Sequence, residues 1–230
     1  MREILNNSVF FGVFINILAF GIGSILNKKL KWPILNPLLV AVAIVIAIIK
    51  VLDLDYENYR TYSKYLSDLL TPATVCLAIP LYQKLELLKK NALAIFLGIF
   101  SGVLASMGSV LALSWMFRLD HAYYVSLLPK SITTAIGMGV STELGGISTV
   151  TVAVIIITGI WGNLVGVAVC RIFRIAEPIA KGLAFGNSAH AIGTTKAMEL
   201  GEVEGAMSSL AIVIAGLITV ISAGLFAGLY

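Results

Sequence analysis

Charge is scarce in this chain. Only 12% of its 230 residues are Asp, Glu, Lys or Arg, and 59% are hydrophobic, whereas a soluble globular domain carries about twice that charged fraction. No hydrophilic stretch is long enough to form a soluble domain. The sequence therefore predicts an all-α polytopic membrane protein, because a helix satisfies its own backbone hydrogen bonds within lipid.

Cysteine and catalytic motifs are equally sparse. Cys76 and Cys170 are the only cysteines, and both lie in apolar runs without metal-ligand spacing or a disulfide framework. The sequence contains no HExxH, P-loop or GxSxG motif and no cluster of His, Cys and carboxylates. We therefore expect neither an enzyme nor a metal or cofactor site. The net charge of +4 comes from cations in short loops without interleaved aromatics, so nucleic-acid binding is not expected either.

Long uncharged runs are abundant by contrast. A bilayer span needs roughly 20 residues, and apolar runs of about 10–14 are more often re-entrant or broken than spanning. The long runs are residues 5–27, 32–49, 91–117, 144–170 and 205–230. The short runs are residues 69–83, 131–142 and 182–195.

Basic clusters predict the orientation of these runs, because Lys and Arg accumulate on the cytoplasmic side. The clusters lie at residues 28–31, 84–90 and 171–181. All three reach the cytoplasm if residues 69–83 span the membrane and residues 131–142 are re-entrant. We therefore predict about six transmembrane helices plus two re-entrant or broken helices that form an inverted repeat. A broken helix that crosses fully is the alternative.

These elements suggest four parts of the chain. The first is an N-terminal two-helix scaffold, and the second is a helix pair that resembles a degenerate copy of the repeat. Two repeat units follow, each with one broken segment. The expected bounds are 1–64, 65–118, 119–174 with the broken segment 131–142, and 175–230 with the broken segment 182–195.

A near-repeat links the two broken segments. Ala-Ile-Gly at 135–137 is followed after five residues by Glu-Leu-Gly at 143–145, and the same triplets recur at 191–193 and 199–201. The offset is 56 residues, and six of eleven positions are identical. Interrupted hydrophobic segments at matching places in two repeats are typical of a transporter site at the bilayer midplane. We expect the glycines to let each helix stop there.

Both segments contain polar side chains, which are costly at membrane depth unless they face protein or a wet cavity. A helix that begins there exposes free N–H groups and partial positive charge, which suit a carboxylate. We expect a small carboxylate to be bound by Ser131, Thr133, Thr134, Asn187, Ser188, His190, Thr194 and Thr195.

Charged and titratable side chains near the segments suggest coupling or charge pairing. His190 is a candidate proton carrier, with a neutral packing histidine as the alternative. Lys130 and Lys196 either face the substrate or snorkel to the interface as anchors. Glu143 and Glu199 occupy equivalent repeat positions, where they form ion pairs or a coupling site, or simply lie exposed.

Three motifs carry a family resemblance. They are Gly-Asn-Ser-Ala-His-Ala-Ile-Gly-Thr at 186–194, Pro-Lys-Ser-Ile-Thr-Thr at 129–134 and Glu-Leu-Gly-Gly at 143–146. With them the chain resembles the LrgB/CidB family over essentially its whole length. The resemblance implies a protein of the bacterial cytoplasmic membrane with a small LrgA-type membrane protein as partner. It also implies one of two roles: antiholin-like control of murein hydrolases and lysis, or transport of glycolate, glycerate or pyruvate.

We predict a secondary transporter of small monocarboxylates of the pyruvate, glycolate or glycerate class, with its site between the two broken helices. The alternative is a holin/antiholin-like pore or regulator of murein hydrolase activity and lysis. Matched polar breaks favour the transporter, since a simple pore needs little more than oligomerising apolar helices. The coupling ion, the transport direction and homo-oligomerisation stay open.

Overall fold

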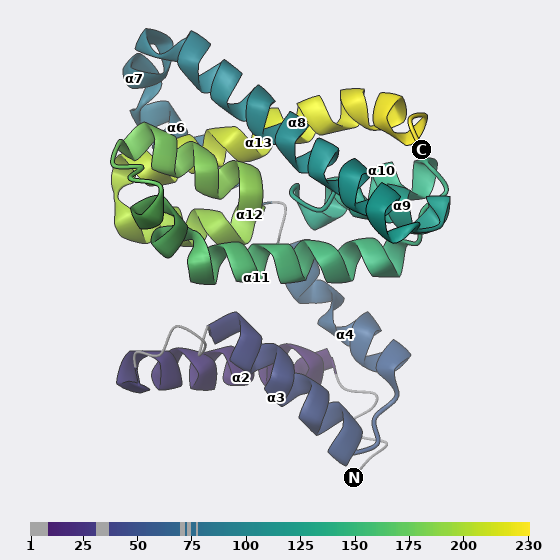
Figure 1. The fold of residues 1–230 in the computed structure, drawn as a ribbon. Coiled ribbons are helices and arrows are strands. Elements are labelled where there is room, and N and C mark those ends of the chain that lie inside the picture. Colours follow the sequence, from purple (N-terminus) through teal and green to yellow (C-terminus); the bar gives the residue numbers. More distant parts are fainter. Residues whose placement is uncertain (1–8, 31–36, 70–71, 73–74, 77) are drawn as a thin grey trace. The chain divides into compact units, whose positions relative to one another are not determined.

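The computed structural model describes residues 9–30, 37–69, 72, 75–76 and 78–230 (Figure 1). Within these ranges the regular secondary structure is entirely helical, so the predicted all-α class is confirmed. The chain divides into two compact units, Met1–Cys76 and Leu77–Tyr230.

The first unit contains α2 (Val9–Leu30), α3 (Pro37–Val51) and α4 (Tyr56–Asp68). Helix α3 begins with a proline, whose fixed φ suits a first helical position and whose missing N–H has no partner there. Helix α2 packs against both α3 and α4. Its contact with α3 is made by Ile15, Ala19, Ala41 and Val45.

The second unit holds the remaining helices. They are α6 (Ala78–Gln83), α7 (Leu85–Lys90), α8 (Ala92–Phe117), α9 (His121–Leu127), α10 (Thr134–Glu143), α11 (Ser148–Ile172), α12 (Pro178–Leu200) and α13 (Glu202–Ala227). Helix α12 packs against both α11 and α13, and α8 contacts α12 and α13 (Figure 1). The buried apolar residues of α8 are Ile95, Ile99, Val103, Met107 and Val110.

Four helices are long and apolar enough to cross a membrane, which confirms a polytopic membrane protein. They are Phe10–Leu30, Ala92–Phe117, Ser148–Ile172 and Glu202–Ala227. The predicted span 32–49 begins outside the described residues and continues as α3, an apolar helix of 15 residues. The predicted span 69–83 also falls partly outside them, and its end forms α6. A total of about six spans therefore stays a prediction.

The near-repeat folds into two similar arrangements. In the first, extended Thr133 precedes α10, and Gly145, with a φ of +80° that favours glycine, leads on to α11. In the second, the segment 182–195 lies within α12, a 23-residue helix interrupted at His190, and Gly201 leads on to α13. Each copy is thus a broken element followed by a long apolar helix.

The expectation that glycines break the second element is wrong. Gly186 and Gly193 are helical, and the interruption falls on His190, with φ 41° and ψ −135°. The glycines instead allow close packing. A Cβ at Gly186 would overlap the carbonyl oxygen of Ser208 on α13, and one at Gly162 of α11 would lie 2.5 Å from the Cβ of Ala189.

Candidate functional site

The irregular stretch between α9 and α10 places a lysine beside two serine hydroxyls. Lys130 Nζ donates hydrogen bonds of 3.1 Å to Ser106 Oγ of α8 and to Ser131 Oγ, and these two oxygens lie 3.0 Å apart. Across the described ranges, no carboxylate oxygen lies within 4.0 Å of Lys130 Nζ. A half-buried ammonium compensated only by hydroxyl groups attracts an anion, because hydroxyls offset part of the cost of removing a charge from water.

Asn187 of α12 lines the same cavity as Lys130, Ser106 and Ser131. Its Nδ2 donates a hydrogen bond of 3.0 Å to the carbonyl oxygen of Ile99 on α8. Asn187 is 8% exposed, and its Oδ1 is buried without a hydrogen-bond partner. Gly102 makes the approach possible, because a Cβ there would overlap Asn187 Nδ2.

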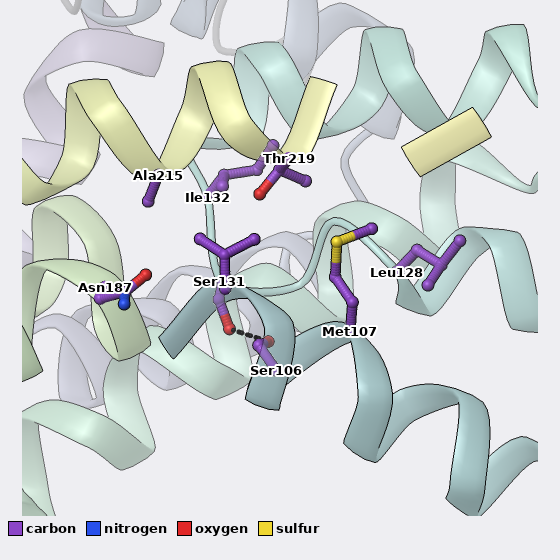
Figure 2. Close-up of a pocket in the computed structure, with 9 residues that line it drawn as sticks. Ser106, Met107, Leu128, Ser131, Ile132, Asn187, Ala215 and Thr219 are labelled. Carbon is purple, nitrogen blue, oxygen red and sulfur yellow. Dashed lines mark hydrogen bonds between the residues drawn. The ribbon is translucent and has the colours of Figure 1, made fainter. Parts of the chain in front are cut away.

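A small cavity of about 10 Å³ is lined by Ser106, Ser131 and Asn187, among others (Figure 2). The amide oxygen of Asn187 points toward the side where Ser131 and Ala215 lie, and the dashed contact joins Ser131 to Ser106 (Figure 2). The cavity is lined by Val103, Ser106, Met107, Leu128, Ser131, Ile132, Asn187, Ala215 and Thr219.

Three residues of this wall come from the broken segments, Ser131, Ile132 and Asn187, and two of them occupy equivalent positions in the repeat. Ser131 and Asn187 are 56 residues apart, which is the offset of the two copies. The structure therefore brings the same position of each copy to one cavity. This geometry resembles that of transporters whose repeats meet at a central site.

A larger cavity of about 1010 Å³ adjoins the same residues and includes Lys130, Asn187 and Ser188. Its α8 wall extends from Asn91 to Ser109, a length of about 27 Å at 1.5 Å per residue. That wall carries only small or polar side chains: Asn91, Ala94, Gly98, Ser101, Gly102, Ala105, Ser106 and Ser109. A further cavity of about 490 Å³ lies against α11 and shares Lys130 and Ser188.

His190 faces α11 and lines none of these three cavities. Its ring nitrogen Nε2 lies 3.0 Å from the carbonyl oxygen of Ile155, and the side chain is buried. A carbonyl only accepts, so Nε2 is the donor. A positive φ is costly for a residue with a side chain, and the bond to Ile155 holds His190 in this conformation.

Thr194, Thr195 and Ser188 form hydrogen bonds within α12, and Thr194 also bonds to α13. Thr194 Oγ1 donates to His190 O at 2.9 Å and pairs with Ser208 Oγ at 2.7 Å. Thr195 bonds to Ile192 O and Ser188 to Ala184 O, both within α12. Thr133 and Thr134 are half-buried at the start of α10. The structure thus gathers Lys130, Ser131, Asn187 and Ser188 around the cavities and places the other predicted binding residues elsewhere.

The other predicted charged residues, Lys196, Glu199 and Glu143, are partly or fully exposed. Lys196 Nζ and Glu199 Oε2 form an ion pair of 2.7 Å within α12, and 66% of the Glu199 side chain is exposed. Glu143 is exposed at the end of α10. Among the residues that the structure describes, no group of three or more His, Cys, Asp or Glu side chains is placed to hold a metal.

The site residues predicted from the sequence did not include Ser106, Gly102 or Thr219. The signal for the first two was a stripe of small residues along 91–109 at helical spacing, which also has the ordinary role of packing helices. Thr219 offered no such signal, because a single threonine in an apolar run is common.

Comparison with known proteins agrees with the motifs. The LrgB-like family model matches residues 16–229. The chain belongs to the LrgB-like family. Its LrgB relatives include antiholin-like protein LrgB of Bacillus subtilis (strain 168), 38% identical over 215 residues that cover 93% of each chain. Antiholin-like protein LrgB of Bacillus mycoides (strain KBAB4) is 37% identical over 218 residues, 94% of this chain and 95% of the relative.

The predicted family is thereby confirmed. Bacterial LrgB relatives and four apolar helices of spanning length also confirm an integral protein of the bacterial cytoplasmic membrane. No solved structure matches the chain.

Proposed function

We propose that the chain is a secondary transporter of small monocarboxylates of the pyruvate, glycolate or glycerate class, and that Lys130 receives the carboxylate. The observation that carries this proposal is the Lys130 ammonium, held by Ser106 and Ser131 beside a cavity of about 1010 Å³. A hydrogen bond to a charged group is worth about 1.5–3 kcal/mol. The serine hydroxyls can rotate from accepting Lys130 protons to donating to carboxylate oxygens.

The close contacts beside the large cavity support a carrier rather than an open pore. Ser106 and Ser131 are in hydrogen-bond contact, and only about 10 Å³ remains between them and Asn187. These three residues come from α8 and from both repeat units. Movement of the repeat units against each other would separate them and open the site to the opposite side, as in inverted-repeat carriers.

The other predicted residues keep secondary roles in this proposal. Proton coupling through His190 requires its ring to exchange the bond with Ile155 O for another partner. Thr133, Thr134, Thr194 and Thr195 stay candidates for contact with substrate in another conformation. The four-part organisation and the inverted repeat are likewise proposals.

A small LrgA-type membrane protein is the proposed partner within the bilayer, with homo-oligomerisation as a further option. The relatives' name, antiholin-like, favours a second candidate, a non-enzymatic pore or regulator of murein hydrolase activity and lysis. That candidate assigns no task to the Lys130 ammonium and the serine hydroxyls beside it.

Reconstitution in liposomes distinguishes the transporter from the pore or regulator. The purified chain is placed in liposomes, alone and with the LrgA-type partner, and uptake of labelled pyruvate and glycolate is measured. We expect saturable uptake that other small monocarboxylates compete for. Leakage of unrelated solutes at unsaturable rates would indicate a pore, and no flux in either preparation would favour the regulator.

A further inference from the structure

We propose that the cavity of about 490 Å³ against α11 binds a fatty acid with a single acyl chain, whose carboxylate contacts Lys130 while the chain lies along α11. A bound fatty acid excludes the small acid, because both need the same ammonium. The inference rests on the proposed role of Lys130 as the group that receives a carboxylate. It adds a second class of ligand, an amphiphilic anion that reaches the protein from the bilayer.

The walls of this cavity are mainly apolar. The apolar side chains include Ile157, Trp161, Val165 and Val169 of α11 and Phe185 of α12. The part of α11 that lines the cavity, residues 157–170, is about 20 Å long at 1.5 Å per residue. Sites for small molecules typically enclose about 300–1,000 Å³, with apolar walls and few polar groups. The cavity therefore has the size and the surface of a site for an apolar chain.

A cation belongs to the same lining. Among the described residues that line the cavity, Lys130 is the single charged side chain. An ammonium has three N–H donors, and two of those of Lys130 bond to Ser106 Oγ and Ser131 Oγ. The third donor is available to a carboxylate oxygen. A charge beside apolar walls is stabilised by a counter-ion with good hydrogen-bond geometry, so the cavity suits an anion that carries an apolar chain.

One acyl chain matches this space better than a small acid or a phospholipid. A CH₂ group takes about the volume of a water molecule, roughly 30 Å³, so the cavity holds about 16 such groups. A fatty acid of about ten to twelve carbons stays within that volume, whereas the two chains of a phospholipid exceed it. A glycolate ion would leave the apolar walls in contact with water, which is unfavourable.

The outer edge of the cavity is accessible from the lipid. Ile157 and Trp161 line the cavity and are each 64% exposed. They belong to α11, one of the helices that are long and apolar enough to cross a membrane. A fatty acid dissolved in the bilayer can therefore enter from the side. Because lipid tails are as apolar as the cavity walls, the carboxylate contact with Lys130 decides whether the chain leaves the bilayer.

The fluorescence of Trp161 tests the proposal. The chain has three tryptophans, so the double variant Trp32→Phe/Trp115→Phe leaves Trp161 as the only one. This protein in phosphatidylcholine vesicles is titrated with 10-bromodecanoate, whose bromine quenches tryptophan on contact, and with 10-bromodecanol as the uncharged control. We expect saturable quenching by the acid and quenching in simple proportion to concentration by the alcohol. Excess glycolate should restore the fluorescence that the acid removes.

Two further changes in the same background locate the ligand. Lys130→Gln removes the charge, and we expect it to weaken the apparent affinity for 10-bromodecanoate at least about tenfold. Val165→Phe narrows the cavity and should weaken binding as well. Leu164→Phe is the matched control, because Leu164 is not among the described residues that line the cavity.

Several results would overturn the site. Equal, unsaturable quenching by the acid and the alcohol would show simple partition into the bilayer. Full binding by correctly folded Lys130→Gln would remove Lys130 as the partner of the carboxylate. If that variant does not fold, equal binding by Val165→Phe and Leu164→Phe overturns the site. Failure of glycolate to compete, in vesicles that take up glycolate, overturns the shared ammonium.

The transport function is judged separately, because quenching requires no transport. Uptake of glycolate without saturable quenching overturns the fatty-acid site and leaves the transporter intact. Saturable quenching that depends on Lys130, in vesicles that take up no small acid, supports the fatty-acid site and overturns the transporter.

Discussion

The side-chain amide of Asn187 is joined to the main chain of Ile99 by a hydrogen bond of 3.0 Å between α12 and α8. This bond turns Asn187 Oδ1 toward the small cavity and fixes one wall of the candidate site. It depends on Gly102, since any side chain there would overlap the amide nitrogen.

Gly102→Ala should therefore disable the site. The new methyl group displaces Asn187, so we expect the hydrogen bond to be lost and the protein to be destabilised by about 1–3 kcal/mol. Gly108→Ala, also on α8, is the matched control because a Cβ there meets no atom within 4 Å. Uptake and thermal unfolding in detergent are measured for both. Equal behaviour of the two variants would contradict the role of Gly102.

Lys130→Gln removes the ammonium while keeping a side chain of similar length. We expect the apparent affinity for small monocarboxylates to fall about ten- to hundredfold, because a hydrogen bond to a charged group is worth about 1.5–3 kcal/mol. Lys196→Gln is the control. Lys196 is paired with Glu199 in an exposed contact, and such pairs contribute about 0–1 kcal/mol. A larger loss at Lys196 than at Lys130 would move the anion site to α12.

His190→Gly should be more stable than His190→Ala, which reverses the usual order in a helix. Both changes remove the ring bond to Ile155, but only glycine adopts a φ of 41° without strain. Alanine is otherwise favoured over glycine by about 1 kcal/mol within helices. Ala191→Gly provides the normal case one residue later. Thermal unfolding measures all three, and a more stable alanine at position 190 would show that the backbone there is ordinary helix.

Tyr124→Phe should lower the free energy of unfolding by about 1 kcal/mol, as expected for one lost hydrogen bond. The Tyr124 hydroxyl donates to the carbonyl oxygen of Phe226 at 2.6 Å, so it ties α9 to the end of α13. Tyr123→Phe is the neighbouring control, because the Tyr123 side chain is exposed. Chemical or thermal denaturation of the purified proteins should separate the two variants.

Much of this architecture follows from local patterns in the sequence. The length of the uncharged run 91–117 predicted a spanning helix, and this run folds as α8 (Ala92–Phe117). Ser131 and Asn187 are separated by the 56-residue offset of the two copies, and both line the small cavity. The helix could be predicted because the length of an uncharged run is a property of the sequence itself, whereas a binding site shared by the two copies stays a prediction.

The remaining details depend on contacts between distant segments. The interruption of α12 falls on His190 rather than on a glycine, where the bond to Ile155, 35 residues away, holds the ring. Ser106 belongs to the site because α8 packs beside the irregular stretch between α9 and α10, where Lys130 bonds to it. The sequence periodicity of α8 and α12 does not determine which helices pack together. The roles of His190 and Ser106 could therefore not be predicted from the sequence.

Counterflow in proteoliposomes tests the central proposal most directly. Vesicles containing the purified chain are loaded with excess unlabelled glycolate and diluted into labelled glycolate, with empty vesicles and Lys130→Gln vesicles in parallel. We expect transient accumulation of label above the outside concentration in the wild type, because a carrier exchanges one acid for another. We expect accumulation to fall sharply in Lys130→Gln. Label that only equilibrates, at the same rate in both proteins, would contradict a carrier with its anion site at Lys130.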